Sequence, residues 1–190
     1  MESIIGHIDK FSRTVGQTFG WSVIILTAGT CFEVFMRYVL NDPTSWAFDM
    51  SYMLYGALFM MAGAYTLSRS GHVRGDFIYR KWKPINQAKV DLVLYVIFFF
   101  PGILAMVGSG LEYGITSVRQ LELSTNSPAG VPVWPLKLII IAAGVTMLIQ
   151  GASEVMRCLV CIKTGNWLPR EGDVEELEVM LQKEHGGVHE

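Results

Sequence analysis

Four runs without a charged residue limit what this sequence can fold into. They cover residues 14–32, 50–68, 92–111 and 138–153. A helix needs about 20 mostly apolar residues to cross the hydrocarbon core of a bilayer, and each run approaches that length. In lipid every backbone polar group must be hydrogen-bonded internally, so each run is expected to be helical. The sequence therefore predicts an all-α integral membrane protein whose four transmembrane helices cover about 14–40, 46–68, 91–115 and 134–162.

The composition agrees with a membrane domain. Hydrophobic residues make up 51% of the 190 residues and charged residues only 17%, which is too apolar for an ordinary soluble domain. The net charge of −2 is small, so a nucleic-acid partner is not expected. We predict one membrane domain over residues 1–168 and an acidic cytoplasmic tail over residues 169–190.

The orientation follows from lysine and arginine in the connecting segments. The segment between the second and third spans carries six basic residues: Arg69, Arg74, Arg80, Lys81, Lys83 and Lys89. The connections on the other side carry Arg119 alone, with Lys137 at the start of the fourth span. Basic connections stay in the cytoplasm. We therefore expect a bacterial cytoplasmic (inner) membrane protein with four spans and both ends in the cytoplasm.

Two segments beside the spans suit the membrane surface. Ile4, Ile5, Ile8 and Phe11 share one helical face, which predicts either a short interfacial helix or a simple extension of the first span. In the basic connection a tryptophan stands among cations, a pattern that favours anchoring at anionic lipid headgroups. The anchoring residues would be Arg80, Lys81, Trp82 and Lys83.

Charged residues inside spans are costly and are therefore candidate functional residues. Glu33 and Arg37 stand one turn apart in the first span, and Asp49 opens the second. One hypothesis makes them a substrate-carboxylate or proton site, with Arg37 holding an anion. The hypothesis that we favour makes them a structural network, because two carboxylates can neutralise one arginine. We expect three further residues at the same outer level to belong to this network or to a subunit interface: Trp46, Glu112 and Lys137.

Small residues recur at spacings that place them on one face of a helix. The pairs are Gly110 with Gly114, Gly56 with Gly63, and Gly144 with Gly151. They predict close contacts between helices of the same bundle. A second subunit is the alternative occupant of these faces.

No pattern for catalysis or for a cofactor is present in the sequence. Cys158 and Cys161 form a single CxxC in an apolar segment, without a second pair or a nearby histidine, so a metal site is not expected. Haem bound inside the bundle would need histidines within the spans. The four histidines all lie outside them: His7, His72, His185 and His189. An enzyme is therefore not predicted.

A series of short motifs, in order along the chain, resembles one family. The motifs are Arg37-Tyr38 with Asn41, Ser45-Trp46 with Asp49, Gly63 with Tyr65, His72-Val73-Arg74 with Asp76, Asp91 with Tyr95, the run 98–101, and Ser127-Pro128 with Pro132, Trp134, Pro135 and Lys137. In these the chain resembles the small membrane subunit (a DctQ-like small permease) of tripartite ATP-independent periplasmic (TRAP) transporters. The details are most similar to the branch labelled for mannitol or chloroaromatic compounds, a label that we do not read as a substrate. Asp49 departs from the glutamate of many members.

The resemblance implies a division of labour among partner proteins. A large permease subunit would carry the substrate with sodium, and a periplasmic binding protein would deliver an organic acid. The small subunit would be a static scaffold, with His72, Arg74 and Asp76 as its motif in the cytoplasmic connection. The alternative is a self-sufficient homo-oligomeric transporter or channel that uses Glu33, Arg37 and Asp49. A third class, an electron-transfer subunit, would need a bound pigment.

Overall fold

The computed structural model describes residues 2–69, 79 and 81–168. This part of the chain is helical apart from its connections. The helices are α1 (Glu2–Gly20), α2 (Ser22–Tyr38), α3 (Ala47–Ser68), α5 (Pro84–Leu94), the π-helical turn η1 (Tyr95–Phe99), α6 (Phe100–Arg119) and α7 (Trp134–Thr164). The predicted all-α fold is confirmed for these residues.

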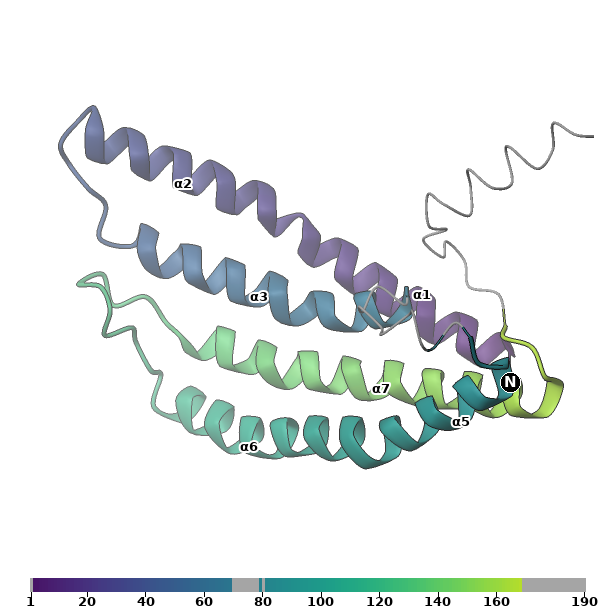
Figure 1. Ribbon diagram of the computed structural model, residues 1–190. Coiled ribbons are helices and arrows are strands. Elements are labelled where there is room, and N and C mark those ends of the chain that lie inside the picture. Colours follow the sequence, from purple (N-terminus) through teal and green to yellow (C-terminus); the bar gives the residue numbers. More distant parts are fainter. Residues whose placement is uncertain (1, 70–78, 80, 169–190) are drawn as a thin grey trace, which may run out of the picture.

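The first two helices form one long element, interrupted only at Trp21 (Figure 1). Of the two interpretations of the N-terminal segment, the extension of the first span agrees with the structure and the separate interfacial helix does not. The reason is packing, because α1 lies against α3 and α7 and buries Ile5 and Ser12 there. Gly16 is buried against Tyr65, where a Cβ would overlap the tyrosine side chain.

The third predicted span is also part of a longer helical stretch. Pro101 has no N–H, so the carbonyl group one turn earlier loses its usual partner in an α-helix. The π-helical turn lies directly before this position, and the N–H of Phe100 bonds to the carbonyl oxygen of Tyr95. A π turn is a common way to absorb such a disturbance without ending the helix.

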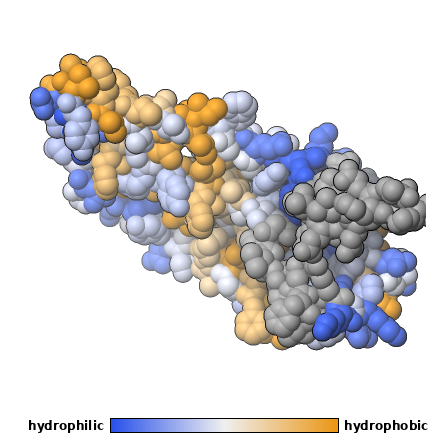
Figure 2. Space-filling model, turned by 45° about the horizontal axis from the view of Figure 1, so that its top comes forward, coloured by the Kyte–Doolittle hydropathy of each residue, from blue (hydrophilic) through white to orange (hydrophobic). Residues whose placement is uncertain are grey.

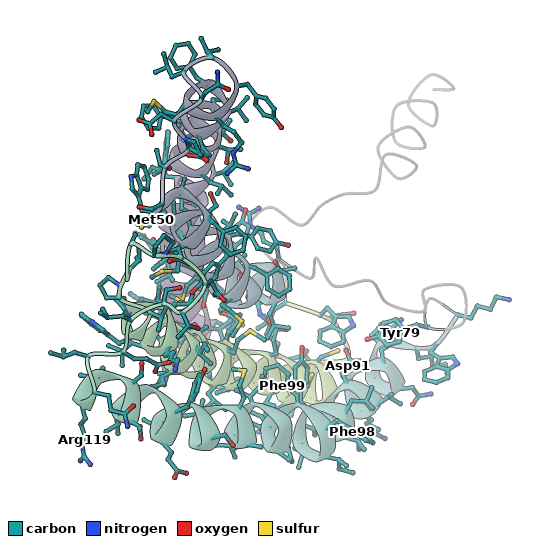
Figure 3. The ribbon with its side chains drawn as sticks, turned by 90° about the vertical axis from the view of Figure 1, so that its left-hand side faces the viewer. Met50, Tyr79, Asp91, Phe98, Phe99 and Arg119 are labelled. Atoms are coloured by element: carbon teal, nitrogen blue, oxygen red, sulfur yellow. The ribbon has the colours of Figure 1, made fainter. Side chains whose placement is uncertain are left out.

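The helices are arranged as a row rather than as a closed bundle. The central α7 packs against α3 on one side and against α5 and α6 on the other, and α2 packs beside α3 at the end of the row. In Figure 3 the α6–α7 pair lies along the bottom, and α1, α2 and α3 rise from it at a steep angle. The molecule therefore has two halves, α1–α3 and α5–α7. We call the contact of α1 and α3 with α7 the seam.

The connections between helices lie at the two ends of the long helices. Residues 39–46 and 120–133 are at one end, on the left in Figure 1. The start of α1, the end of α3, the start of α5 and the end of α7 are at the other end. On the face drawn in Figure 2, apolar residues extend from the left-hand tip along the middle of the molecule, and hydrophilic residues gather toward the right-hand end.

Three helical stretches are long and apolar enough to cross a membrane: Glu2–Tyr38, Pro84–Arg119 and Trp134–Thr164. The predicted second span is a helix of 22 residues, α3, but it is not in this set. Its sequence contains Asp49 and three tyrosines, which lower its mean hydropathy. The length of α3 is sufficient to cross a membrane, because a helix of 22 residues reaches about 33 Å at 1.5 Å per residue.

The paired glycines face neighbouring helices of the same chain. A Cβ at Gly114 would lie 2.7 Å from Cδ1 of Ile141, and one at Gly63 would lie 3.2 Å from Sδ of Met147. Gly144 and Gly151 of α7 are buried against Val107 and Phe99, with no room for a Cβ. The prediction that these glycines serve contacts inside the bundle is confirmed. They let the backbones of α3, α6 and α7 approach closely.

Candidate functional site

Polar side chains gather at both ends of the seam. At the end near the start of α1, the Arg157 guanidinium is 4% exposed and its Nη2 donates to Oδ2 of Asp9. The other carboxylate oxygen of Asp9 accepts from Nε2 of Gln150 at 2.9 Å and from Oγ of Ser153 at 3.3 Å. Glu154 completes the group, since its Oε1 accepts from Gln150 at 3.3 Å and lies 3.8 Å from Nε of Arg157. We call these five residues the Asp9 cluster.

Helical spacing explains why α7 can build most of this cluster. Positions 150, 153, 154 and 157 fall on one face of a helix, at intervals of three and four residues. That face is directed at α1, which supplies Asp9 from 148 residues away in the sequence. A buried guanidinium needs a charged partner, and here the carboxylates of Asp9 and Glu154 both surround it. The cluster therefore ties the first helix to the last.

Sequence reasoning missed the Asp9 cluster. The available signal was the polar series Gln150, Glu154 and Arg157 at helical spacing within the otherwise apolar fourth predicted span, 134–162. Asp9 gave no such signal, because it lies among residues expected at the membrane surface. Only the position of α1 against α7 identifies it as the partner.

At the opposite end of the seam the buried carboxylate is Asp49, at the start of α3. It is 0% exposed. Its Oδ1 accepts from Oγ of Ser124 at 2.8 Å, and its Oδ2 accepts from Oγ of Ser127. Ser124 in turn accepts from the backbone N–H of Asn126 at 3.1 Å, which orders the loop. Asp49 thus holds the 120–133 connection, which leads into α7, against the start of α3.

The predicted grouping of Glu33, Arg37 and Asp49 is divided in the structure. Glu33 and Arg37 do pair, with Nη2 and Nε of Arg37 at 2.7 and 3.2 Å from Oε1 of Glu33. The second oxygen of Glu33 accepts from the backbone N–H of Thr44 at 3.1 Å and from its hydroxyl. Asp49 instead accepts hydrogen bonds from Ser124 and Ser127. The loop serines, which sequence spacing could not place, are the physical reason for the division.

The other residues predicted near this level are also distributed differently. Lys137 is 8% exposed, and its Nζ lies 2.5 Å from Oε2 of Glu122 and 3.7 Å from the centroid of the Tyr113 ring. The hydrogen bond from Lys137 holds the pKa of the Glu122 carboxyl, which lies in the connection outside the helices, below its ordinary value. Glu112 is exposed on α6.

Trp46 immediately precedes α3. Its ring stacks on Phe32 of α2 at a centroid distance of 6.3 Å, and 41% of its surface is exposed. It therefore adds an aromatic contact between α2 and the start of α3, beside the Glu33–Thr44 hydrogen bonds. Aromatic side chains in such positions fit the interfacial level of a membrane.

At the start of α5 the predicted surface residues are exposed. Lys81 and Lys83 are exposed, as is Trp82, which packs near the ring of Tyr79. The hydroxyl of Tyr79 donates to Oδ2 of Asp91 at 2.7 Å. Four predicted residues lie outside the described part of the chain: His72, Arg74, Asp76 and Arg80.

The two cysteines of the CxxC are packing residues. Cys158 and Cys161 are buried with Ala88 in a small core between α5 and α7. Sγ of Cys161 donates to the carbonyl oxygen of Pro84 at 3.6 Å. Within residues 2–69, 79 and 81–168 no group of three metal-ligating side chains comes together.

This arrangement of long apolar helices defines a multi-pass membrane protein. The family profile described as tripartite ATP-independent periplasmic transporters, DctQ component, matches residues 26–161. The chain therefore belongs to this family and is a small subunit of a TRAP transporter in the inner membrane, a transport component and not an enzyme. A comparison with curated proteins found no match.

The matched residues run from α2 to the end of α7. They include Asp49, both loop serines and Arg157. Asp9 precedes them, so the Asp9 cluster joins the family region to the helix before it.

Proposed function

We propose that this chain is the static scaffold of its transporter. It assembles with a large permease subunit that imports an organic acid together with sodium, and the helices of this chain carry neither the substrate nor the coupling ion. A periplasmic binding protein delivers the substrate. Membership in the family supports the partnership.

The observation that carries the scaffold proposal is the pairing of the buried charges. Four charged side chains are buried in the described residues: Asp49, Lys137, Glu154 and Arg157. Each contacts a partner within the same chain, and those of Asp49 and Arg157 join the two halves across the seam. Charges that line a transport path must be able to exchange partners with a substrate or an ion. Charges whose hydrogen bonds are made within the chain instead hold helices in fixed positions.

We propose that α3 is the fourth span, since it lies in the same row as the three apolar stretches. In this topology the 39–46 and 120–133 connections face the periplasm, and both ends of the chain face the cytoplasm. Basic residues of the described chain support this direction, because they are more numerous at the end that holds the start of α1. Those at that end are Lys10, Arg13, Arg69, Lys81, Lys83, Lys89, Arg157 and Lys163.

Anchoring at the membrane surfaces is a further part of the proposal. Exposed Lys81, Trp82 and Lys83 would meet the cytoplasmic headgroups, together with Arg80, which lies outside the described part of the chain. Trp46 would meet the periplasmic interface. A scaffold fixed at both surfaces resists being carried along when a neighbouring subunit moves.

The self-sufficient transporter is the weaker proposal. It needs Glu33, Arg37 and Asp49 to act as one coupling site. Glu33 and Arg37 are paired beside Thr44, whereas Asp49 is bonded to Ser124 and Ser127. The grouping on which that function depends is therefore not assembled in this chain.

Affinity purification of the tagged subunit from native membranes in mild detergent tests the scaffold proposal. We expect mass spectrometry to find a large multi-span permease in near-equal amount. Recovery of this chain alone as a defined homo-oligomer would overturn the proposal. A purified complex also allows uptake of candidate organic acids to be measured after reconstitution, with and without a sodium gradient.

The topology has its own test. Single cysteines at Thr125 and Asn166, both exposed, would be introduced into a variant without the native cysteines. We expect a membrane-impermeant thiol reagent to label Thr125→Cys in intact spheroplasts, and to label Asn166→Cys only after permeabilisation. The reverse pattern would contradict the proposed orientation.

A further inference from the structure

We infer that a cavity beside the start of α1 binds the phosphate group of an anionic phospholipid. The cavity has a volume of about 460 Å³ and lies between α1, the end of α3 and the end of α7. Lys10 and Arg13 line it from α1, Ser68 and Arg69 from α3, and Arg157 from α7. The inference rests on the proposed orientation, which places this end of the molecule at the cytoplasmic leaflet.

The charge of the lining favours an anion. Four basic side chains line the cavity, against the two carboxylates of Glu2 and Asp9. The Asp9 carboxylate already accepts hydrogen bonds from three residues of α7, so its charge is directed into the protein. Arg69 lies over the ring of Tyr65, with its guanidinium carbon 5.6 Å from the ring centroid, which restrains the side chain at the cavity edge.

Arg157 forms the inner wall of the cavity. Its side chain is 4% exposed, and its Nε makes no hydrogen bond among the described residues. A guanidinium has five N–H donors, and a buried one contributes more potential than one in water. The carboxylates of Asp9 and Glu154 balance the charge of Arg157, so the net positive potential of the cavity comes from the basic side chains of its other walls, Lys10, Arg13 and Arg69.

The surface beside the cavity favours a lipid as the source of the phosphate. Ile4 and Phe11 are exposed by 57% and 46%, and their spacing of seven residues places them on one face of α1. This apolar face borders the one that carries Lys10. A phospholipid would place its headgroup among the basic side chains and its acyl chains against Ile4 and Phe11. Basic pockets between helices at the cytoplasmic leaflet bind anionic headgroups in this manner.

Native mass spectrometry of the full chain in a neutral detergent tests the inference. Phosphatidylglycerol and phosphatidylcholine would be added separately, and we expect the chain to retain phosphatidylglycerol preferentially. The double variant Lys10→Gln with Arg69→Gln should bind it about tenfold more weakly, because two basic contacts are lost. Lys89→Gln with Lys163→Gln removes the same charge from two exposed positions at the same end of the molecule that do not line the cavity, and should bind as the wild type does.

Three results would overturn the inference. They are equal retention of the two lipids, unchanged binding by the Lys10 and Arg69 double variant, and displacement of phosphatidylglycerol by equimolar glycerol phosphate, which would assign the cavity to a soluble phosphate. Thermal unfolding in phosphatidylcholine verifies that each variant is folded, and Lys10→Gln alone replaces the double variant if that variant is not. Because binding is measured on the subunit in detergent, its failure would leave the copurification result intact.

Discussion

Lys137 is held in a nearly enclosed position by two different contacts. Its ammonium group donates to the carboxylate of Glu122, and it also lies over the ring of Tyr113. Both contacts lie where the 120–133 connection enters α7, so this lysine fixes the direction in which the last helix begins. The carboxylate partner outside the helices makes the contact sensitive to pH.

Glu122→Gln should lower the midpoint of thermal unfolding in detergent slightly at pH 7. The pKa of Glu122 is lowered from 4.5 in the folded protein because Lys137 donates to it. Its contribution to stability is therefore complete above pH 4.5 and is lost as the pH falls through the lowered pKa. The difference in midpoint between wild type and variant should be constant from about pH 7 to pH 5 and should shrink below pH 4.5. A difference that stays constant to pH 3 would contradict this, and Glu2→Gln, at an exposed position, serves as the control.

The contact of α6 with α7 depends on the π-helical turn. Figure 3 shows Phe99 between the two helices and Phe98 directed away from them. Phe98 is 69% exposed, whereas Phe99 packs against Gly151, where a Cβ would overlap its ring. The extra residue of the π turn and the missing side chain at Gly151 thus act together to bring the helices close.

Gly151→Ala should destabilise the subunit by about 1–3 kcal/mol, because the new methyl group forces the Phe99 ring to move. Gly108→Ala is the matched control on α6, since a Cβ there meets nothing within 4 Å. Alanine at that position should be neutral or stabilising by up to about 1 kcal/mol, since it favours the helix. Unfolding in a denaturing detergent measures both, and equal effects of the two substitutions would contradict the proposed contact.

Charged residues mark where each apolar run stops, and each of the four predicted spans overlaps a helix or helical stretch of the structure. The predicted 134–162 differs from α7 (Trp134–Thr164) by two residues at one end. The sequence did not predict the arrangement of the helices in a row, because apolar surfaces that face lipid and those that face another helix have the same composition. The pairing of Glu33 with Arg37 could be predicted because the two residues are one helical turn apart. The partners of Asp49 and Arg157 could not be predicted, because they depend on which distant segments come together.

At the scale of the whole molecule, the two polar groups lie at opposite ends of one seam. Asp49 joins α3 to the loop before α7, and Asp9 joins α1 to the end of α7. Between them the contact is made by small residues such as Gly56 and Gly63 of α3. The relative position of the halves is therefore fixed at both ends by directional hydrogen bonds and in the middle by packing.

Asp9→Ala should weaken this connection by about 3 kcal/mol, because it removes the carboxylate that is hydrogen-bonded to a buried guanidinium. Asp42→Ala, in the exposed 39–46 connection, should have little effect. Adding both Arg157→Gln and Glu154→Gln to Asp9→Ala should restore part of the loss, since no charged member of the cluster then stays buried. Equal thermal midpoints for wild type and Asp9→Ala would show that the cluster does not hold the halves together.

The place of α2 at the end of the row has a consequence for the isolated subunit. None of its residues is buried, and its packing partner beyond α1 is α3. Local opening of α2, by rotation about the break at Trp21, thus exposes little that was covered and requires little free energy. Among the helices, α2 should then show the fastest amide hydrogen exchange in detergent. Slower exchange of α2 in a membrane would measure how strongly a neighbouring molecule packs against this helix.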